Sequence, residues 1–166
     1  MRILDTSDAH EVLAYSNVII VIWRQPPRAE LIQQLYILGE RLTIEQGVPK
    51  VSVISVVDRH FRQAPSPAAR AALTELHRDP KQILHRMGLV FVNEGFVLAS
   101  IRSVLLSVKN KLMGTSNSDV FRKFEDAAHW VTQGLASVNR RSVSPAPLSA
   151  EVNRYMAQQK ASSLAS

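Results

Sequence analysis

Three short apolar runs limit what this chain can fold into. They occupy residues 17–23 (NVIIVIW), 51–57 (VSVISVV) and 88–93 (GLVFVN), and all three are rich in β-branched residues. The runs are mostly apolar and do not alternate strictly between apolar and polar residues, which is the pattern of a strand buried on both faces. Segments with the apolar periodicity of helices lie between the runs. This order of strands and helices predicts an α/β domain with a mostly parallel or mixed central sheet.

About four helices are predicted around this sheet of 4–5 strands. The first helix ends at Gly47, a residue type that accepts the left-handed conformation found after helix C-termini. The second begins after Ser66, with Pro67 at the first helical position. The other two are predicted at residues 96–112 and 123–136. Short strands are predicted at residues 11–14 and 119–121.

The apolar pattern stops near residue 138. Residues 1–138 are therefore predicted to form one domain, which suits a chain of 166 residues with 46 % hydrophobic residues. Residues 139–166 are rich in Ser, Ala and Pro and are predicted to be a flexible, basic tail. Within it, residues 149–160 have the pattern of a transient helix, with Val152, Tyr155 and Met156 on one stripe.

Charge and cysteine content narrow the class of function. The net charge is +6, concentrated in residues 78–123 and in the tail. We interpret the charge as solvated helix faces and disfavour nucleic acid as a partner, since no dense basic run or interleaved aromatic residues accompany it. The chain has no cysteine, which excludes disulfides and thiolate metal sites. Without a secretory pattern at its start, the expected location is cytoplasmic.

Residues with catalytic potential are few. The six glycines form no phosphate-binding loop, and no paired histidines have metal-ligand spacing. Asp58, His60 and Arg62 follow a core strand at the edge where a parallel sheet usually presents a site, and residues 23–25 end another strand there. We interpret Asp58 as bonding its own loop. Neither an enzyme, a metal nor a cofactor is expected.

The order of segments resembles the SpoIIAA-like branch of the STAS fold. The resemblance rests on NVIIVIWRQPP before a helix, VSVISVVD, PSPAA opening the next helix, GLVFVN and DVFRKFEDAAHWV. It covers roughly residues 10–138 and implies a non-enzymatic module of bacterial regulation or signalling. Phosphoswitch members carry a serine or threonine at the start of the helix after the second core strand, where this chain has Ser66. Because Ser66 lies in an Ala-Pro-Ser-Pro context, a plain helix cap is the favoured interpretation and a regulated site the alternative.

We therefore expect a protein-interaction module whose partner is another protein. The expected surface comprises Asp58, His60, Phe61, Arg62, Arg102, Lys109, Lys111 and Tyr155. The alternative is binding of a lipid or other apolar ligand, or of an anionic membrane surface, because the amphipathic segment 96–112 carries basic residues beside its apolar face. A homodimer also stays open.

Overall fold

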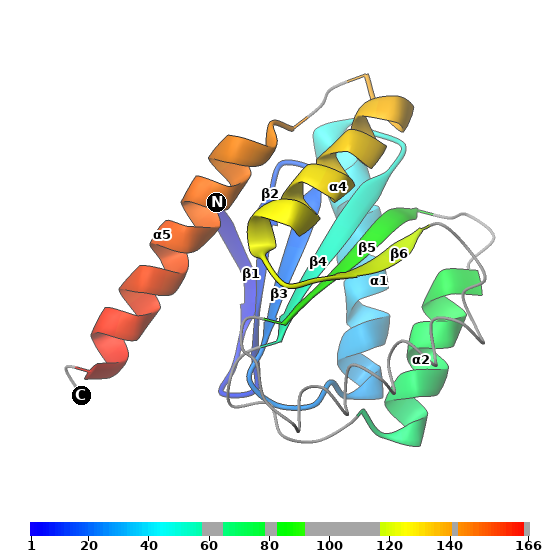
Figure 1. Ribbon diagram of the computed structural model, residues 1–166. Coiled ribbons are helices and arrows are strands. Elements are labelled where there is room, and N and C mark those ends of the chain that lie inside the picture. Colours follow the sequence, from blue (N-terminus) through cyan, green and yellow to red (C-terminus); the bar gives the residue numbers. More distant parts are fainter. Residues whose placement is uncertain (58–64, 79–82, 92–116, 141–142, 165–166) are drawn as a thin grey trace.

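The computed structural model describes residues 1–57, 65–78, 83–91, 117–140 and 143–164 (Figure 1). The described elements are β1 (Arg2–Thr6), β2 (His10–Tyr15), β3 (Val18–Trp23), α1 (Ala29–Gln46), β4 (Val51–Val57), α2 (Pro67–Arg78), β5 (Leu84–Phe91), β6 (Ser118–Phe121), α4 (Phe124–Val138) and α5 (Pro145–Leu164). Among these helices, none is both long and apolar enough to cross a membrane.

The strands lie in the sheet in the order in which the chain visits them, from β1 to β6. The first three pair antiparallel, whereas β3, β4, β5 and β6 run parallel. The predicted α/β fold with a mixed central sheet is confirmed. The described sheet has six strands. The additional one, β1, is short and mostly exposed, so its sequence carries no alternating apolar pattern.

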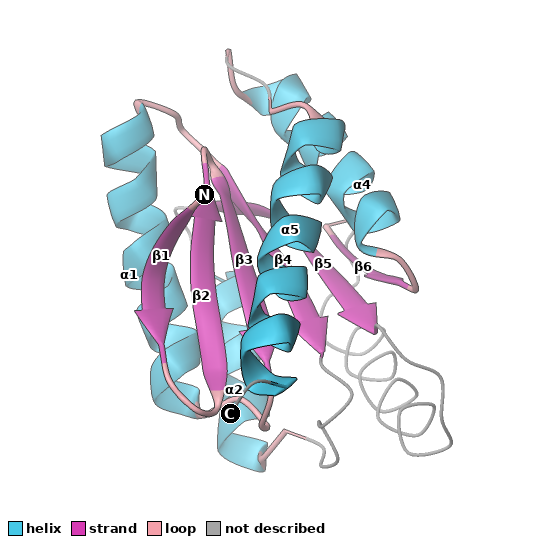
Figure 2. Cartoon of the chain, turned by 90° about the vertical axis from the view of Figure 1, so that its left-hand side faces the viewer, coloured by secondary structure: helices cyan, strands magenta, loops and turns pink. Residues whose placement is uncertain are grey.

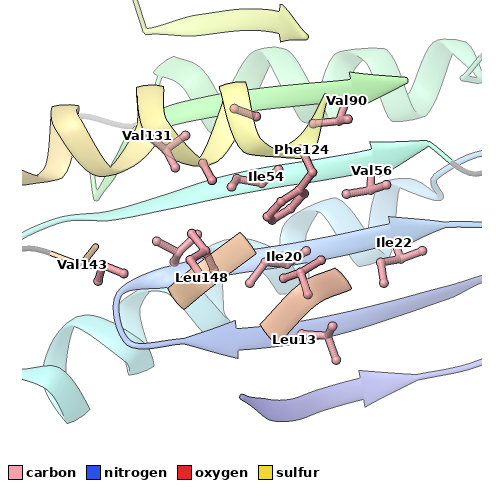
Figure 3. Packing of buried hydrophobic residues seen from close by; sticks show 14 of the residues in the cluster. Leu13, Ile20, Ile22, Ile54, Val56, Val90, Phe124, Val131, Val143 and Leu148 are labelled. Atoms are coloured by element: carbon pink, nitrogen blue, oxygen red, sulfur yellow. The ribbon is translucent and has the colours of Figure 1, made fainter. Parts of the chain in front are cut away.

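Helices cover both faces of the sheet (Figure 2). The side chains of Ile19, Val21 and Trp23 join a core cluster with α1. Their neighbours on the other face join a second cluster with α4 and α5 (Figure 3). Helix α2 packs against α1 through Ile32, Ala69, Ala72 and Leu76. The domain therefore has three layers, with β3 and β4 at the centre.

The local signals of the sequence agree with the structure. Gly47 has φ 60° and ψ 39°, the left-handed conformation predicted after α1. The Ala69 N–H donates to Ser66 Oγ at 3.1 Å, so Ser66 is the N-cap of α2. Strand β4 has the predicted bounds, and β5 begins four residues before the predicted strand. The helix predicted at residues 96–112 lies outside the described residues.

The C-terminal segment differs from the prediction of a flexible tail after residue 138. Residues 145–164 form α5, which packs against α4 and the sheet. Val143, Leu148 and Val152 are buried, and Tyr155 and Met156 pack against the same cluster. Ser149, the first residue of the predicted transient helix, lies buried inside α5. Sparse apolar residues suffice here because they meet an apolar sheet face that residues 1–138 leave partly uncovered.

We predict that Leu148→Ala lowers the free energy of unfolding by about 2–5 kcal/mol, because the side chain is fully buried and its removal leaves a cavity. Arg154→Ala, on the exposed side of α5, should change it by less than about 1 kcal/mol. Urea unfolding of both variants measures the difference. Equal small effects would contradict the position of α5 in the core.

Candidate functional site

The carboxyl edge of the parallel strands carries a compact group of polar side chains. Strand β3 ends at Trp23, directly beside Val57 at the end of β4. The turn between β1 and β2 lies over this edge, because the N–H groups of Arg24 and Gln25 both donate to the Ala9 carbonyl oxygen, at 2.9 and 3.0 Å. Ligands of open α/β sheets bind at this edge, so it is the natural place to look for a site.

His10 is held between two side chains of its own turn. Its Nε2 lies 3.0 Å from Asp5 Oδ2, and its Nδ1 lies 3.0 Å from Ser7 Oγ. The imidazole also packs against Trp23, with ring centroids 6.1 Å apart. This contact follows from the register, since His10 is the cross-strand partner of Trp23.

The bonded series Asp5, His10 and Ser7 has the residue types of a hydrolytic triad. However, Ser7 Oγ already accepts the backbone N–H groups of Ala9 and His10, at 3.2 and 3.3 Å. Both lone pairs of the Ser7 hydroxyl oxygen, which would be the nucleophile of a triad, are thereby engaged in closing the turn. The Asp5 side chain is also one-third exposed. We therefore interpret the series as a lock on the β1–β2 turn.

A hollow of about 410 Å³ opens beside this lock, and we call it the edge hollow. Its walls come from the β1–β2 turn, from the end of β3 and from the start of α1. The lining residues are residues 7–10, Trp23, Gln25, Pro26, Arg28 and Leu31. Arg28 is the residue before α1, and its side chain makes no capping hydrogen bond. The hollow is thus bounded by two well-ordered strand ends and one helix start.

A buried ion pair lies on the opposite face of the same strand ends. Glu11 is 4 % exposed, and its carboxylate oxygen Oε1 accepts a hydrogen bond from Arg24 Nη2. Among the described residues, the other oxygen, Oε2, has no hydrogen-bond partner. Arg24 also donates from Nη1 to the Ser7 carbonyl oxygen at 3.3 Å. One guanidinium therefore joins the turn to a carboxylate on the α5 side of the sheet.

Tyr155 brings α5 into this group. Burial is the largest influence that raises the pKa of its hydroxyl, and the nearby Glu11 carboxylate raises it further. Gln159, one turn along α5, donates to the Tyr155 oxygen at 3.1 Å. The polar group at the strand ends is therefore completed by a residue from the far end of the chain.

Removing Arg24 should expose the cost of the buried carboxylate. We predict that Arg24→Met lowers the free energy of unfolding by about 2–3 kcal/mol, because Glu11 is left buried without its cation. The double variant Glu11→Met with Arg24→Met should lie within about 1 kcal/mol of the wild type, because neither charge is then buried. Urea unfolding of the double-mutant cycle measures the coupling. Additive losses would contradict it.

The raised pKa of Tyr155 predicts a dependence of stability on alkaline pH. The unfolded chain releases this proton near pH 10, whereas the folded chain holds it to higher pH. Stability is therefore lost as the pH rises above 10, and Tyr155→Phe should lose less than the wild type between pH 9.5 and 11. Urea midpoints measured across this range, each relative to pH 8, test the sign. Equal losses would contradict a contribution from Tyr155.

A second surface feature lies between α1 and α2. A hollow of about 460 Å³ is lined mostly by apolar side chains, those of Ile32, Tyr36, Ile37, Ala72 and Leu76. Ile37 is 63 % exposed, and Ile44, two turns along the same side of α1, is 80 % exposed. Glu75 is the charged residue in the described lining. We call Ile37, Ile44 and this hollow the α1–α2 face.

Most residues of the expected interaction surface fall outside the described residues. These are Asp58, His60, Phe61, Arg62, Arg102, Lys109 and Lys111. Ser66 is exposed, and its hydroxyl caps α2. Tyr155 lies half-buried against its own domain instead of on a free tail.

The structure adds residues that the sequence analysis did not single out, above all Glu11 and His10. The sequence does carry a signal for Glu11, because an acidic residue in the otherwise apolar strand predicted at residues 11–14 indicates a paired, buried charge. Within the described residues, no group of three His, Asp or Glu side chains is placed to hold a metal ion. Comparison with protein-family models, with curated proteins and with solved structures finds no match to this chain.

Proposed function

We propose that this chain is a non-enzymatic protein-interaction module of bacterial regulation or signalling, and that it binds its partner through the α1–α2 face. The observation that carries the proposal is the exposure of Ile37 in the wall of an apolar hollow, with Ile44 exposed two turns further along the same side of α1. Large apolar side chains gathered at one exposed place on a soluble domain are typical of contact surfaces. Here they lie on a regular helix, which offers a partner a rigid surface.

The partner that fits is a helical segment of another protein. A groove between two helices accepts an amphipathic helix whose apolar residues recur at helical spacing. Glu75 in the lining favours a lysine or arginine on the partner, because opposite charges at the rim orient an incoming helix. The partner of this proposal is therefore a helix with one apolar stripe and a basic residue at its edge.

The order of elements supports the resemblance to STAS domains on which the regulatory part of the proposal rests. Where they are described, the segments that carry the resemblance form β3, β4, the start of α2, β5, β6 and α4. Strands β3 to β6 follow one another in the sheet without a change of direction.

Site-specific photo-crosslinking in the native cell tests this function. A benzoylphenylalanine at position 44 should crosslink to one defined protein, whereas the same group at the exposed Gln158 of α5, on the other side of the sheet, should not. Ile37→Asp should reduce the crosslink at position 44 at least about tenfold, because a carboxylate in the groove opposes an apolar contact.

Three outcomes would contradict the proposal. Equal crosslinking from positions 44 and 158 would show nonspecific binding to the protein surface. An Ile37→Asp variant that crosslinks as strongly as the wild type would show that the exposed isoleucines do not contribute to partner binding. A crosslink between two copies of this chain would make the α1–α2 face a self-association surface instead.

A further inference from the structure

The walls of the edge hollow are fixed before any ligand arrives. On one side, Arg24 and Gln25 are bonded to Ala9, and His10 is locked by Asp5 and Ser7. On another side, Trp23 is 6 % exposed and belongs to the core. A volume of about 410 Å³ lies within the range of small-molecule sites, which are usually preformed. The hollow is therefore a built feature of this edge.

The interior of the hollow is largely apolar. Trp23, Pro26 and Leu31 supply ring and aliphatic surface, and Ala9 adds a methyl group. Leu31 is the first buried side chain of α1, so this surface is continuous with the core. A ligand that fills the hollow must therefore present an apolar body, most favourably a flat ring that packs along the tryptophan and the proline.

Two residues of the lining carry donors that have no partner within the described part of the chain. Among the described residues, no ion pair or hydrogen bond engages the Arg28 guanidinium, which is exposed at the rim. The Trp23 indole N–H is likewise not hydrogen-bonded within the described part of the chain, although the residue is more than nine-tenths buried. Free donors next to apolar surface favour a ligand that carries an acceptor-rich anionic group.

The charged side chains in the described lining favour a group with a single negative charge. Arg28 is the one arginine or lysine in the described lining, and Asp8 lies in the same lining as an opposing carboxylate. One guanidinium would neutralise only half of the charge of a dianion, and Asp8 would repel the other half. We propose that the edge hollow binds a small monoanion with an aromatic or compact apolar body, such as an arylalkyl carboxylate. Arg28 pairs with the carboxylate, and Trp23, Pro26 and Leu31 contact the apolar body.

The two tryptophans provide a test with an internal control. Trp23 lines the hollow, whereas Trp130 lies on α4 under the Arg86 guanidinium, 4.6 Å from the ring centroid. In a ¹H–¹⁵N spectrum of the full chain, 4-phenylbutyrate should shift the Trp23 indole signal in a saturable way and leave that of Trp130 unchanged. Trp130→Phe assigns the two signals. The neutral 4-phenylbutyramide should bind at least about tenfold more weakly, because it forms no charge-assisted pair.

Matched variants separate the role of Arg28 from general charge. Arg28→Ala should weaken binding of 4-phenylbutyrate at least about tenfold, whereas Arg140→Ala, which removes an exposed arginine elsewhere, should not change it. Ala9→Leu should block binding by filling the hollow.

Several results would overturn the inference: no shift at millimolar 4-phenylbutyrate, equal shifts of both indole signals, or equal affinities of the wild type and Arg28→Ala. None of these results bears on crosslinking through α1, so this inference and the proposed function stand or fall separately.

Discussion

The complete burial of β3 is the constraint on which the rest of the structure depends. All six residues of this strand are buried, with alternate side chains entering two separate cores. A strand of this kind is stable only when helices cover both faces of its sheet. Helix α1 supplies one cover, and α4 together with α5 supplies the other. The antiparallel strands β1 and β2 then extend the sheet beyond its parallel half.

This constraint explains which parts of the fold the sequence could predict. Continuous β-branched runs mark β3 and β4, and helix signals at Ser66 and Gly47 are local, so both kinds of feature are visible in a short window. Helix α5 is different, because its few apolar residues are stabilising only through their contact with the sheet face. The apolar face of β2 and β3 must be buried by another segment, and this requirement follows from the tertiary structure. No local sequence pattern indicates it.

The candidate site shows the same division. The sequence indicates the edge of the sheet at which the edge hollow lies, since Trp23, Arg24 and Gln25 follow a core strand there. It does not indicate that Glu11 faces Arg24 or that His10 packs on Trp23, because both contacts depend on the antiparallel register of β2 with β3. A shift of one residue would exchange the faces that Glu11 and His10 occupy. Register is set by the whole hairpin and lies beyond single-residue patterns.

Arg24 has a consequence that reaches from one face of the sheet to the other. Its guanidinium bonds the Ser7 carbonyl oxygen beside the edge hollow and the Glu11 carboxylate beside Tyr155 of α5. The position of the β1–β2 turn and the docking of the last helix therefore share one cation. Thermodynamic linkage is reciprocal. A change that stabilises the β1–β2 turn around Arg24 also stabilises the packing of α5 on the sheet. The packing of α5 stabilises the turn by the same free energy.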